Sequence, residues 1–285
     1  MSRWIAVTPA RDEESLLPGL IASMSAQSRP CSRWIIIDDG SRDRTSAIAD
    51  DAARRHPWIE VVHLPSGRPR AEGGEGAVAQ VLRGLQRDDF DFLLRVDADL
   101  TFDPDFASLL IAEFARDPKL GIAGPTLLEP GARGWQPVIQ PAFHTRGAAK
   151  TYSRPCLTAI GPLEAGLGWD TLDEAQAMML GFRTRSFRHI HARHHRPQGA
   201  AGGLWRARAA AGIAAYRVGY SPLFVLARAG RQALSGPGPA GALAFVGGYL
   251  GSLLRRRPRA ASPELITFVR RQQLRRLFRQ DSLWR

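Results

Sequence analysis

Two carboxylates one residue apart follow an apolar segment near the end of the first third of the sequence. Asp97 and Asp99 flank Ala98, and the apolar run from Phe90 to Val96 predicts a strand that ends at Asp97. Carboxylate oxygens suit Mg²⁺ and Mn²⁺, which commonly bridge protein carboxylates to phosphates. An isolated Asp-x-Asp pair is more often a solvated acidic turn, so the motif predicts a cation site only with support from other residues.

A second acidic motif supplies part of that support. Residues 38–45, Asp-Asp-Gly-Ser-Arg-Asp-Arg-Thr, follow the apolar run from Trp34 to Ile37. In a purely structural interpretation this is a strand-to-helix turn, with flexibility at Gly40 and a helix cap at Asp43 or Thr45. In a functional interpretation the same turn aims a carboxylate at the imide N–H and hydroxyls of a nucleoside.

The elements around these motifs alternate between strand and helix. Such alternation predicts an α/β fold with a mostly parallel sheet and helices on both faces, and ligands then bind at the carboxyl ends of the strands. The first strand end, residues 8–13, is expected to form a second wall of that site. The predicted strands are residues 4–8, 34–37, 59–62 and 90–96, and the predicted helices are residues 13–25, 45–55, 75–86 and 171–180.

Together these motifs resemble the family 2 inverting glycosyltransferases, which have the GT-A fold. Residues 9–13 match the family's Pro-x-x-Asn-Glu opening with Asp12 in place of Asn, and residues 38–45 match its Asp-Asp-Gly-Ser-x-Asp-x-Thr signature. Residues 74–77 approximate its Gly-x-Gly-x-Ala helix start, and residues 97–99 match its Asp-x-Asp motif. Order and spacing agree over about the first 130 residues.

The resemblance implies roles for these residues. Glu13 and Asp39 are expected to contact the base and ribose of a nucleotide-sugar donor, with a UDP-sugar favoured. Asp99, together with Asp97, is expected to hold a divalent cation, Mg²⁺ or Mn²⁺, against the diphosphate, where it offsets charge on the leaving group. The full set expected to bind the nucleotide is Thr8, Pro9, Ala10, Arg11, Glu13, Asp39, Gly76, Asp97 and Ala98.

A histidine cluster follows the region that matches the family. Many GT-A enzymes bring a histidine from just past the base helix to the metal or diphosphate, and His194 and His195 match that place. Arg196 is expected to pair with the diphosphate. Without the resemblance, such a cluster of His and Arg is a solvated basic loop.

An inverting transfer also needs a base that takes the proton of the acceptor hydroxyl. The family places it in a Glu-Asp pair about eleven residues before a Gly-aromatic dipeptide, and Asp170 stands at that distance from Gly181, with Trp169 in place of Glu. Asp173 and Glu174 are the alternatives. Asp170 also has the position of a simple helix N-cap.

The charge is divided between the two parts of the chain. The 285 residues carry a net charge of +12, but residues 181–285 contain 20 Arg, no Lys and two acids, or +18, and residues 1–180 carry −6. The apolar segment 240–254 runs directly into Arg255, and residues 269–278 form a cationic amphipathic pattern. These are core helices with charged ends, or helices that lie on an anionic membrane surface.

Composition indicates the cellular compartment in which the protein is found. Cys31 and Cys156 are too few for a disulfide framework, which indicates a reducing compartment. The apolar run after Met1 is too short for a signal peptide, and no uninterrupted apolar stretch is long enough to predict a spanning helix. We therefore expect a cytoplasmic protein, peripheral on the inner face of the cytoplasmic membrane.

The function expected from all of this is sugar transfer to a hydroxyl of a lipid-linked glycan in surface polysaccharide synthesis. Residues 1–200 are expected to form the GT-A catalytic domain, with nucleotide-binding residues 1–100 and acceptor and base residues 101–200, followed by a helical, Arg-rich, membrane-associating region at 201–285. One alternative is a polyprenyl-phosphate sugar synthase. A second is a nucleic-acid-binding protein using the basic tail, but no nucleic-acid motif stands there, so no nucleic acid is expected.

Overall fold

The computed structural model describes residues 2–66, 78, 90–196, 203–234 and 238–284. Most of the expected helix at 75–86, and the predicted nucleotide contact Gly76, lie outside these residues. Nine strands form one sheet within the described part of the chain. They are β1 (Trp4–Ala10), β2 (Arg33–Asp38), β3 (Ile59–His63), β4 (Phe92–Val96), β5 (Leu100–Phe102), β6 (Leu120–Gly131), β7 (Gly134–Pro137), β8 (Ala149–Ser153) and β9 (Arg183–His194).

The helices begin where the sequence supplies a start signal. Pro18 occupies the first turn of the first helix, and the Ser153 and Ser262 hydroxyls accept N–H bonds at the starts of α5 and α10. The described helices are α1 (Leu17–Ser25), α2 (Thr45–Arg55), α4 (Phe106–Arg116), α5 (Arg154–Ile160), α6 (Trp169–Met179), α7 (Gly203–Val218), α8 (Pro222–Ala233), α9 (Gly238–Leu254) and α10 (Pro263–Leu277).

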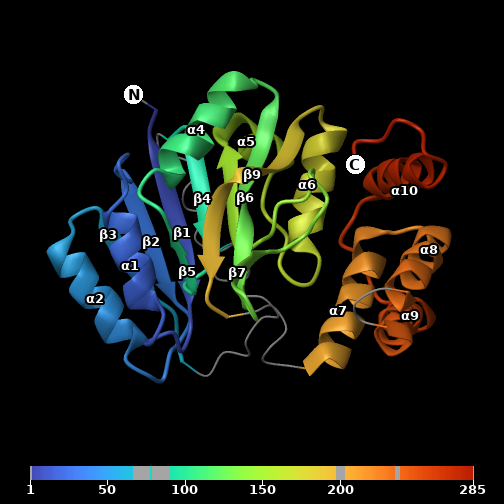
Figure 1. The fold of residues 1–285 in the computed structure, drawn as a ribbon, viewed down its shortest axis with the longest axis horizontal. Helices are drawn as coiled ribbons and strands as arrows, with labels where there is room; N and C mark the ends of the chain where they lie inside the picture. The colour runs from blue at the N-terminus through green and yellow to red at the C-terminus, as the bar shows by residue number, and fades with distance from the viewer. Residues whose placement is uncertain (1, 67–77, 79–89, 197–202, 235–237, 285) are drawn as a thin grey trace.

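The sheet has a parallel half and a mixed half. Its order is β3-β2-β1-β4-β8-β6-β9-β5, with β7 paired to β6. The first four of these strands run parallel, while β8 is antiparallel to both β4 and β6, and β5 is antiparallel to β9. The parallel strands therefore all end at one edge, the lower edge of the sheet in Figure 1.

Two hydrophobic clusters cover the sheet, one on each face. Alternate residues of β1 divide between them: Trp4 and Ala6 pack with α1, α2 and α4, whereas Ile5 and Val7 pack with α5 and α6. This split is the period of two expected for a strand buried on both faces. The predicted α/β architecture with helices on both faces is confirmed, and the sheet is mixed where a mostly parallel one was expected.

The helices from α7 to α10 form a layer beside α6, on the side of the molecule away from α1 and α2 (Figure 1). A third hydrophobic cluster joins Leu172 and Met178 of α6 to Tyr216, Phe245 and Val269 of that layer. None of the described helices has the length and hydropathy needed to cross a membrane. The Arg-rich segment is thus a helical extension that packs on α6.

Glycines set the closest contact in this layer. A Cβ built on Gly212 of α7 would lie 2.0 Å from the carbonyl oxygen of Phe245, and one on Gly248 of α9 would lie 2.1 Å from that of Ala209. Only glycine lets the two backbones approach this closely. Of the glycines that interrupt the apolar segment 240–254, Gly248 therefore serves helix packing, whereas a Cβ on Gly247 would meet nothing within 4 Å.

Candidate active site

The loops that follow β1 and β2 are bound to each other. The Asp12 N–H donates to Ser41 Oγ at 3.2 Å, and the Arg42 N–H donates to Asp12 Oδ1 at 2.8 Å. Asp12 has a φ of 56°, a left-handed conformation that Asn and Asp tolerate better than most residues. Position 12 therefore joins the two strand ends, where the family pattern has Asn.

The two aspartates after β2 have different surroundings. Asp38 is buried and accepts hydrogen bonds from the Ser41 N–H, the Ser46 hydroxyl and His63. Burial opposes its charged form, but these bonds outweigh burial and lower the pKa of Asp38. Asp39 instead has its Oδ2 3.6 Å from Nη1 of Arg11. Asp38 therefore organises the turn, and Asp39 is the carboxylate at the strand end that a ligand can reach.

Glu13 and Arg196 meet although they lie far apart in the sequence. The guanidinium donates to both carboxylate oxygens of Glu13, at 2.9 and 2.7 Å. Glu13 is buried, and its own N–H donates to Thr45 Oγ1 at 2.7 Å. Two residues predicted to bind different parts of the donor thus form one bidentate ion pair at the edge where β1 ends.

Four other residues predicted to bind the nucleotide expose little of their side chains. Thr8, Pro9 and Ala10 lie in β1, and Ala98 lies between β4 and β5. Thr8 is buried and its hydroxyl accepts a hydrogen bond from the Trp34 indole N–H at 2.9 Å. Ala10 and Ala98 are buried, and Pro9 is half-buried. Any contact that these four residues make with a ligand therefore comes chiefly from their backbone.

The Asp-x-Asp motif lies between β4 and β5. The Asp97 N–H donates to the carbonyl of Ala148, and its carboxylate is 2.6 Å from the guanidinium of the buried Arg95. The Asp99 carbonyl accepts the N–H of His195, and β5 pairs with β9 so that Leu100 faces His194. Strand pairing therefore brings the histidine cluster to the metal motif.

Within that cluster the two predicted histidines face different ways. His194 is buried, with Nε2 3.4 Å from Asp99 Oδ1 and Nδ1 3.4 Å from Glu129 Oε1 of β6. His195 is exposed, with its Nε2 2.8 Å from the Thr101 hydroxyl and its ring 5.2 Å from that of Trp135. Of the two, His194 is the one beside the Asp-x-Asp motif.

The chemistry of this group fits a divalent cation. Among the described residues, the buried atoms Asp99 Oδ1, Glu129 Oε1 and His194 Nδ1 have no hydrogen-bond partner. No three His, Cys, Asp or Glu side chains of the described chain form a ready metal cage. One or two protein ligands are nevertheless the usual number for Mg²⁺ that is also held by a substrate's phosphates. Asp99 and His194, with Asp97 adjacent, can supply them.

The three acidic residues of α6 differ in surroundings. Asp170 lies in the first turn with a half-buried side chain, and its carboxylate makes no hydrogen bond to any described residue. Asp173 is buried and bound by Lys150 Nζ at 2.9 Å and the Tyr152 hydroxyl at 2.5 Å. Glu174 is buried and bound by His144 and by the N–H and hydroxyl of Thr145.

These contacts set the ionisation of the cluster. Burial raises the pKa of Asp173 to about 7, against the opposing charge of Lys150. Burial also disfavours the charged Glu174, but the charges of Lys150 and His144 outweigh it and lower the pKa of Glu174. Lys150, which lies 3.2 Å from Glu174, stays charged because its burial is outweighed by the two acids, which raise its pKa. The cluster anchors α6 in a fixed position.

Trp169 connects this helix to the metal motif. Its ring lies 5.1 Å from the Arg95 guanidinium and 5.3 Å from the Lys150 ammonium. Arg95 in turn pairs with Asp97, so one chain of contacts runs from the Asp-x-Asp motif to the start of α6. Asp170 follows Trp169 directly in the first turn of α6.

Sequence reasoning missed Arg95, Glu129 and Lys150. Arg95 and Lys150 are charged residues within otherwise buried strands, and this is the signal that could have singled them out, since such residues are buried only when paired. Glu129 lies near the end of a strand that turns into a hairpin and has no such signal. Only the fold brings it to His194.

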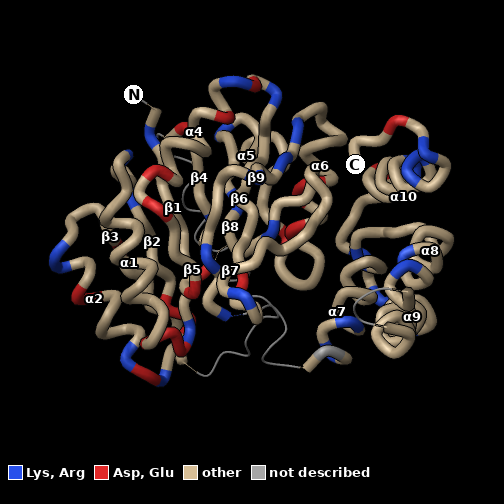
Figure 2. The backbone as a smooth tube through the Cα atoms, in the orientation of Figure 1, with Lys and Arg blue, Asp and Glu red and all other residues tan. Residues whose placement is uncertain are grey.

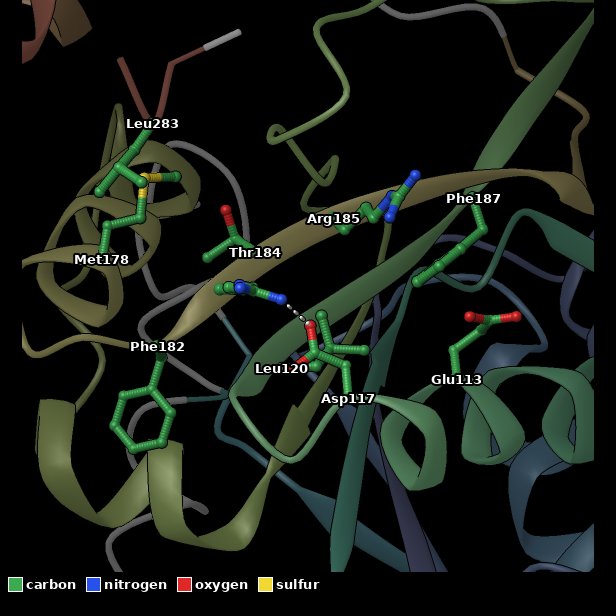
Figure 3. Close-up of a pocket in the computed structure, with 10 residues that line it drawn as sticks. Glu113, Asp117, Leu120, Met178, Phe182, Thr184, Arg185, Phe187 and Leu283 are labelled. Carbon is green, nitrogen blue, oxygen red and sulfur yellow. Dashed lines mark hydrogen bonds and ion pairs between the residues drawn. The ribbon is translucent and has the colours of Figure 1, made fainter. Parts of the chain in front are cut away.

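A pocket of about 220 Å³ lies elsewhere (Figure 3). Leu120 and Arg183, at the starts of β6 and β9, line it together with Phe182 and Leu283. His194 is at the opposite end of β9, so this pocket is separate from the predicted donor site.

A comparison with protein-family models matches residues 5–160 to glycosyl transferase family 2. These residues include β1, β2 and β4 with the strand ends described above, and they make up more than half of the chain. The chain belongs to glycosyl transferase family 2.

Two curated relatives support this assignment. The poly-beta-1,6-N-acetyl-D-glucosamine synthase of Staphylococcus epidermidis is 27% identical over 110 residues, which cover 39% of this chain and 25% of that protein. The undecaprenyl-phosphate 4-deoxy-4-formamido-L-arabinose transferase of Pseudomonas paraeruginosa is 29% identical over 113 residues, which cover 39% of this chain and 32% of that protein. The match thus spans a quarter to a third of these family 2 relatives.

A solved structure shares the fold over nearly the whole chain. The mannosyltransferase PcManGT of Pyrobaculum calidifontis, solved with GDP-Man and Mn²⁺, is 16% identical with a TM-score of 0.59. The superposition covers 98% of this chain and 76% of that one. The similarity therefore extends beyond the family match, into the C-terminal helices.

Proposed function

We propose that this family 2 enzyme transfers a sugar, with inversion, from a nucleotide-sugar donor to a hydroxyl of a glycan acceptor. The observation that carries the proposal is that the buried atom Asp99 Oδ1, which has no hydrogen-bond partner among the described residues, lies 3.4 Å from His194 Nε2 at the motif after β4. The Glu13–Arg196 and Arg11–Asp39 pairs follow β1 and β2, and these strands end at the same edge of the sheet. A cation bound to Asp99 and His194 would offset charge on the leaving diphosphate.

Asp170 is the proposed base. It has the least engaged carboxylate of the three acids in α6, and a base must be within reach of a substrate proton. In this proposal the oxygen of the acceptor hydroxyl attacks the anomeric carbon from the face opposite the diphosphate. Asp170 accepts the proton of that hydroxyl as the attack occurs. Asp173 and Glu174 act through Lys150 as positioning residues that keep α6 in place.

The donor base proposed is uracil. A carboxylate at the Asp39 position accepts a hydrogen bond from an imide N–H, which uracil carries, and Arg11 beside it fixes the direction of that carboxylate. Guanine also offers a ring N–H, and the neighbour of known structure was solved with GDP-Man. The donor experiment below therefore compares both bases.

The acceptor proposed is a lipid-linked glycan, at the cytoplasmic face of the membrane. The +18 charge of residues 181–285 favours an anionic surface, and the names of both curated relatives describe glycan or lipid-carrier chemistry. In this proposal residues 1–200 form the catalytic domain, and residues 201–285 hold it close to the membrane.

A second candidate is transfer of the sugar directly to a polyprenyl phosphate, which the relative that acts on undecaprenyl phosphate favours. A phosphate acceptor is already ionised and needs no base. Asp170→Asn would then leave transfer nearly unchanged, whereas transfer to a hydroxyl should fall by about 10²- to 10⁴-fold with donor binding retained. Turnover of the Asp170→Asn variant separates the two candidates.

The decisive test of the proposal is donor binding. We expect calorimetry of the full chain with UDP-, GDP- and TDP-sugars to give binding of one nucleotide class that needs Mn²⁺. Asp99→Ala should abolish the Mn²⁺-dependent part, while Asp105→Ala, at the start of α4, serves as the matched acidic control. Absence of binding to every nucleotide by folded protein would reject the proposal.

A further inference from the structure

Leucines stand exposed in rows on the two adjacent helices α8 and α9. On α8 and its C-cap, Leu223, Leu226 and Leu234 are 53%, 60% and 93% exposed. Their spacing of three and eight residues puts them on one side of a helix. The buried residues Val225 and Ala229 are on the opposite side, packed in the third hydrophobic cluster.

The second row is on α9. Leu243, Leu250 and Leu254 are 70%, 46% and 81% exposed, again at helical spacing. The inner side of α9 carries Phe245 and Tyr249, which are buried against the neighbouring helices. Each helix is thus covered on one side and bears uncovered leucines on the other. Single exposed leucines are ordinary, but two rows on adjacent helices leave this layer with an unusual amount of exposed apolar side chain.

Positive charge adjoins these rows. Arg255, Arg256 and Arg257 follow Leu254 directly and are exposed. Arg228 of α8 lies over the ring of Phe245 on α9, which keeps a guanidinium at the junction of the two helices. The acids of residues 181–285 are Glu264 and Asp281, neither of which is on α8 or α9. Figure 2 shows basic residues, all of them Arg in this layer, as its dominant charges.

We infer that the exposed rows of α8 and α9, together with Arg255–Arg257, form a docking surface for an anionic lipid bilayer. Leucines that insert into the acyl boundary beside arginines that meet phosphate headgroups are the arrangement of an interfacial helix. No described helix spans a membrane, so this surface would attach the chain without crossing the bilayer. The inference rests on the proposed function only for its purpose, which is access to a lipid-linked acceptor.

Packing links this surface to the proposed base. Arg217 of α7 donates to the carbonyl of Ala165 at 3.0 Å, and Gly168 at the start of α6 packs against Ala214 and Val218 of α7. α7 in turn contacts α9 through the glycine pair Gly212 and Gly248. A bilayer that holds α8 and α9 would therefore hold the start of α6 at a fixed distance from its surface.

The test is flotation of the full chain with lipid vesicles. We expect the chain to float with vesicles of phosphatidylglycerol and phosphatidylcholine, but not with phosphatidylcholine alone. Leu226→Gln/Leu250→Gln should weaken partitioning by about tenfold or more, because two inserted leucines are lost. Ile139→Gln/Leu180→Gln removes two exposed apolar side chains outside the surface and should float like wild type.

Separate experiments test the role of the arginines and the possibility that a second copy of the chain, instead of a bilayer, covers this surface. The variant Arg255→Gln/Arg256→Gln/Arg257→Gln should float less than wild type at low salt. Added salt should reduce the flotation of wild type more than that of this variant. Wild type that stays unbound, or a Leu226→Gln/Leu250→Gln variant that floats like wild type, would overturn the inference. So would a dimer in light scattering that this double variant dissociates, because a second copy would then cover the surface. Donor calorimetry on the same samples reports separately on the proposed function.

Discussion

The Arg196 guanidinium holds both carboxylate oxygens of Glu13, although the two residues lie far apart in the sequence. Arg196 follows β9 and the loop of Glu13 follows β1, so the pair ties the last strand of the sheet in sequence to the first. An arginine fixed in this way has less side-chain entropy to lose when it binds a phosphate. Glu13 is therefore expected to contribute to donor binding partly by holding Arg196 in place.

Replacement of Glu13 by Gln tests that dependence. The change removes a charge-assisted bidentate pair, so we expect donor affinity in calorimetry to fall by about tenfold to a hundredfold. Glu60→Gln is the matched control, because Glu60 makes a similar bidentate pair with Arg33, with both distances 2.8 Å, on an exposed part of β2 and β3. Equal donor affinities in wild type and Glu13→Gln would contradict the expectation.

Glu129 is expected to orient His194 for metal binding. A histidine ligand commonly donates its second ring N–H to a carboxylate, and loss of that partner typically weakens metal affinity by about 10- to 100-fold. We therefore expect Glu129→Gln to weaken Mn²⁺ binding by about tenfold or more, measured from free Mn²⁺ by electron paramagnetic resonance without any donor. Glu113→Gln is the control, since Glu113 lies 3.4 Å from a different histidine, His189. Unchanged Mn²⁺ affinity in Glu129→Gln would assign Glu129 to structure alone.

The two lysines of the chain offer a contrast in burial. Lys150 is fully buried between Asp173 and Glu174, whereas Lys119 is exposed. Lys150→Met leaves two buried carboxylates without their cation and should lower the free energy of unfolding by about 3–5 kcal/mol. Lys119→Met should change it by no more than about 0.5 kcal/mol. Urea denaturation of both variants gives the comparison, and similar midpoints would contradict the proposed anchoring of α6.

His63 predicts a pH-dependent contribution to stability. Its hydrogen bond to Asp38 and the nearby Asp50 raise the pKa of His63 above 6.5, in spite of partial burial. A raised pKa means that the folded state binds the proton more tightly, so the stabilisation is complete below pH 6.5 and is lost as the pH rises through the folded-state pKa. In urea denaturation, His63→Ala should lower the free energy of unfolding more at about pH 6 than at about pH 9. His191→Ala, on an exposed site, is the control; an equal loss at both pH values would refute the assignment.

Local sequence patterns predicted the parallel half of the sheet. The predicted helix 45–55 has the bounds of α2, and the strands predicted at 34–37 and 59–62 differ from β2 and β3 by one residue at some ends. These segments are short and strongly apolar or amphipathic, so local patterning decides their structure. The strand-end carboxylates could be located for the same reason.

The strand β9 could not be predicted in the same way. Arg and His occupy much of it, and the solvated basic loop considered as an alternative for the histidine cluster is instead strand as far as His194. His189 and His191 are exposed, and Ile190 and Ala192 between and after them are buried. This alternation is only a weak indication of a strand, because charged residues have low strand propensity and β9 is stabilised mainly by pairing with its neighbours. The choice between His194 and His195 depends on that alternation.

Among the acids of α6, sequence spacing alone left Asp170, Asp173 and Glu174 open. The difference between them comes from Lys150 and Tyr152 of β8 and from the segment that carries His144, which contact α6 only after the sheet has formed. Long-range contacts of this kind leave no local signature.

Trp169 and Gly147 occupy a shared volume. A Cβ at position 147 would lie 2.6 Å from Cζ2 of the Trp169 ring, so an indole at 169 is compatible only with glycine at 147. The two positions are therefore expected to vary together among relatives: where the usual Glu stands in place of Trp169, position 147 is released from this constraint. The departure from the family pattern at Trp169 thus requires a small residue at position 147.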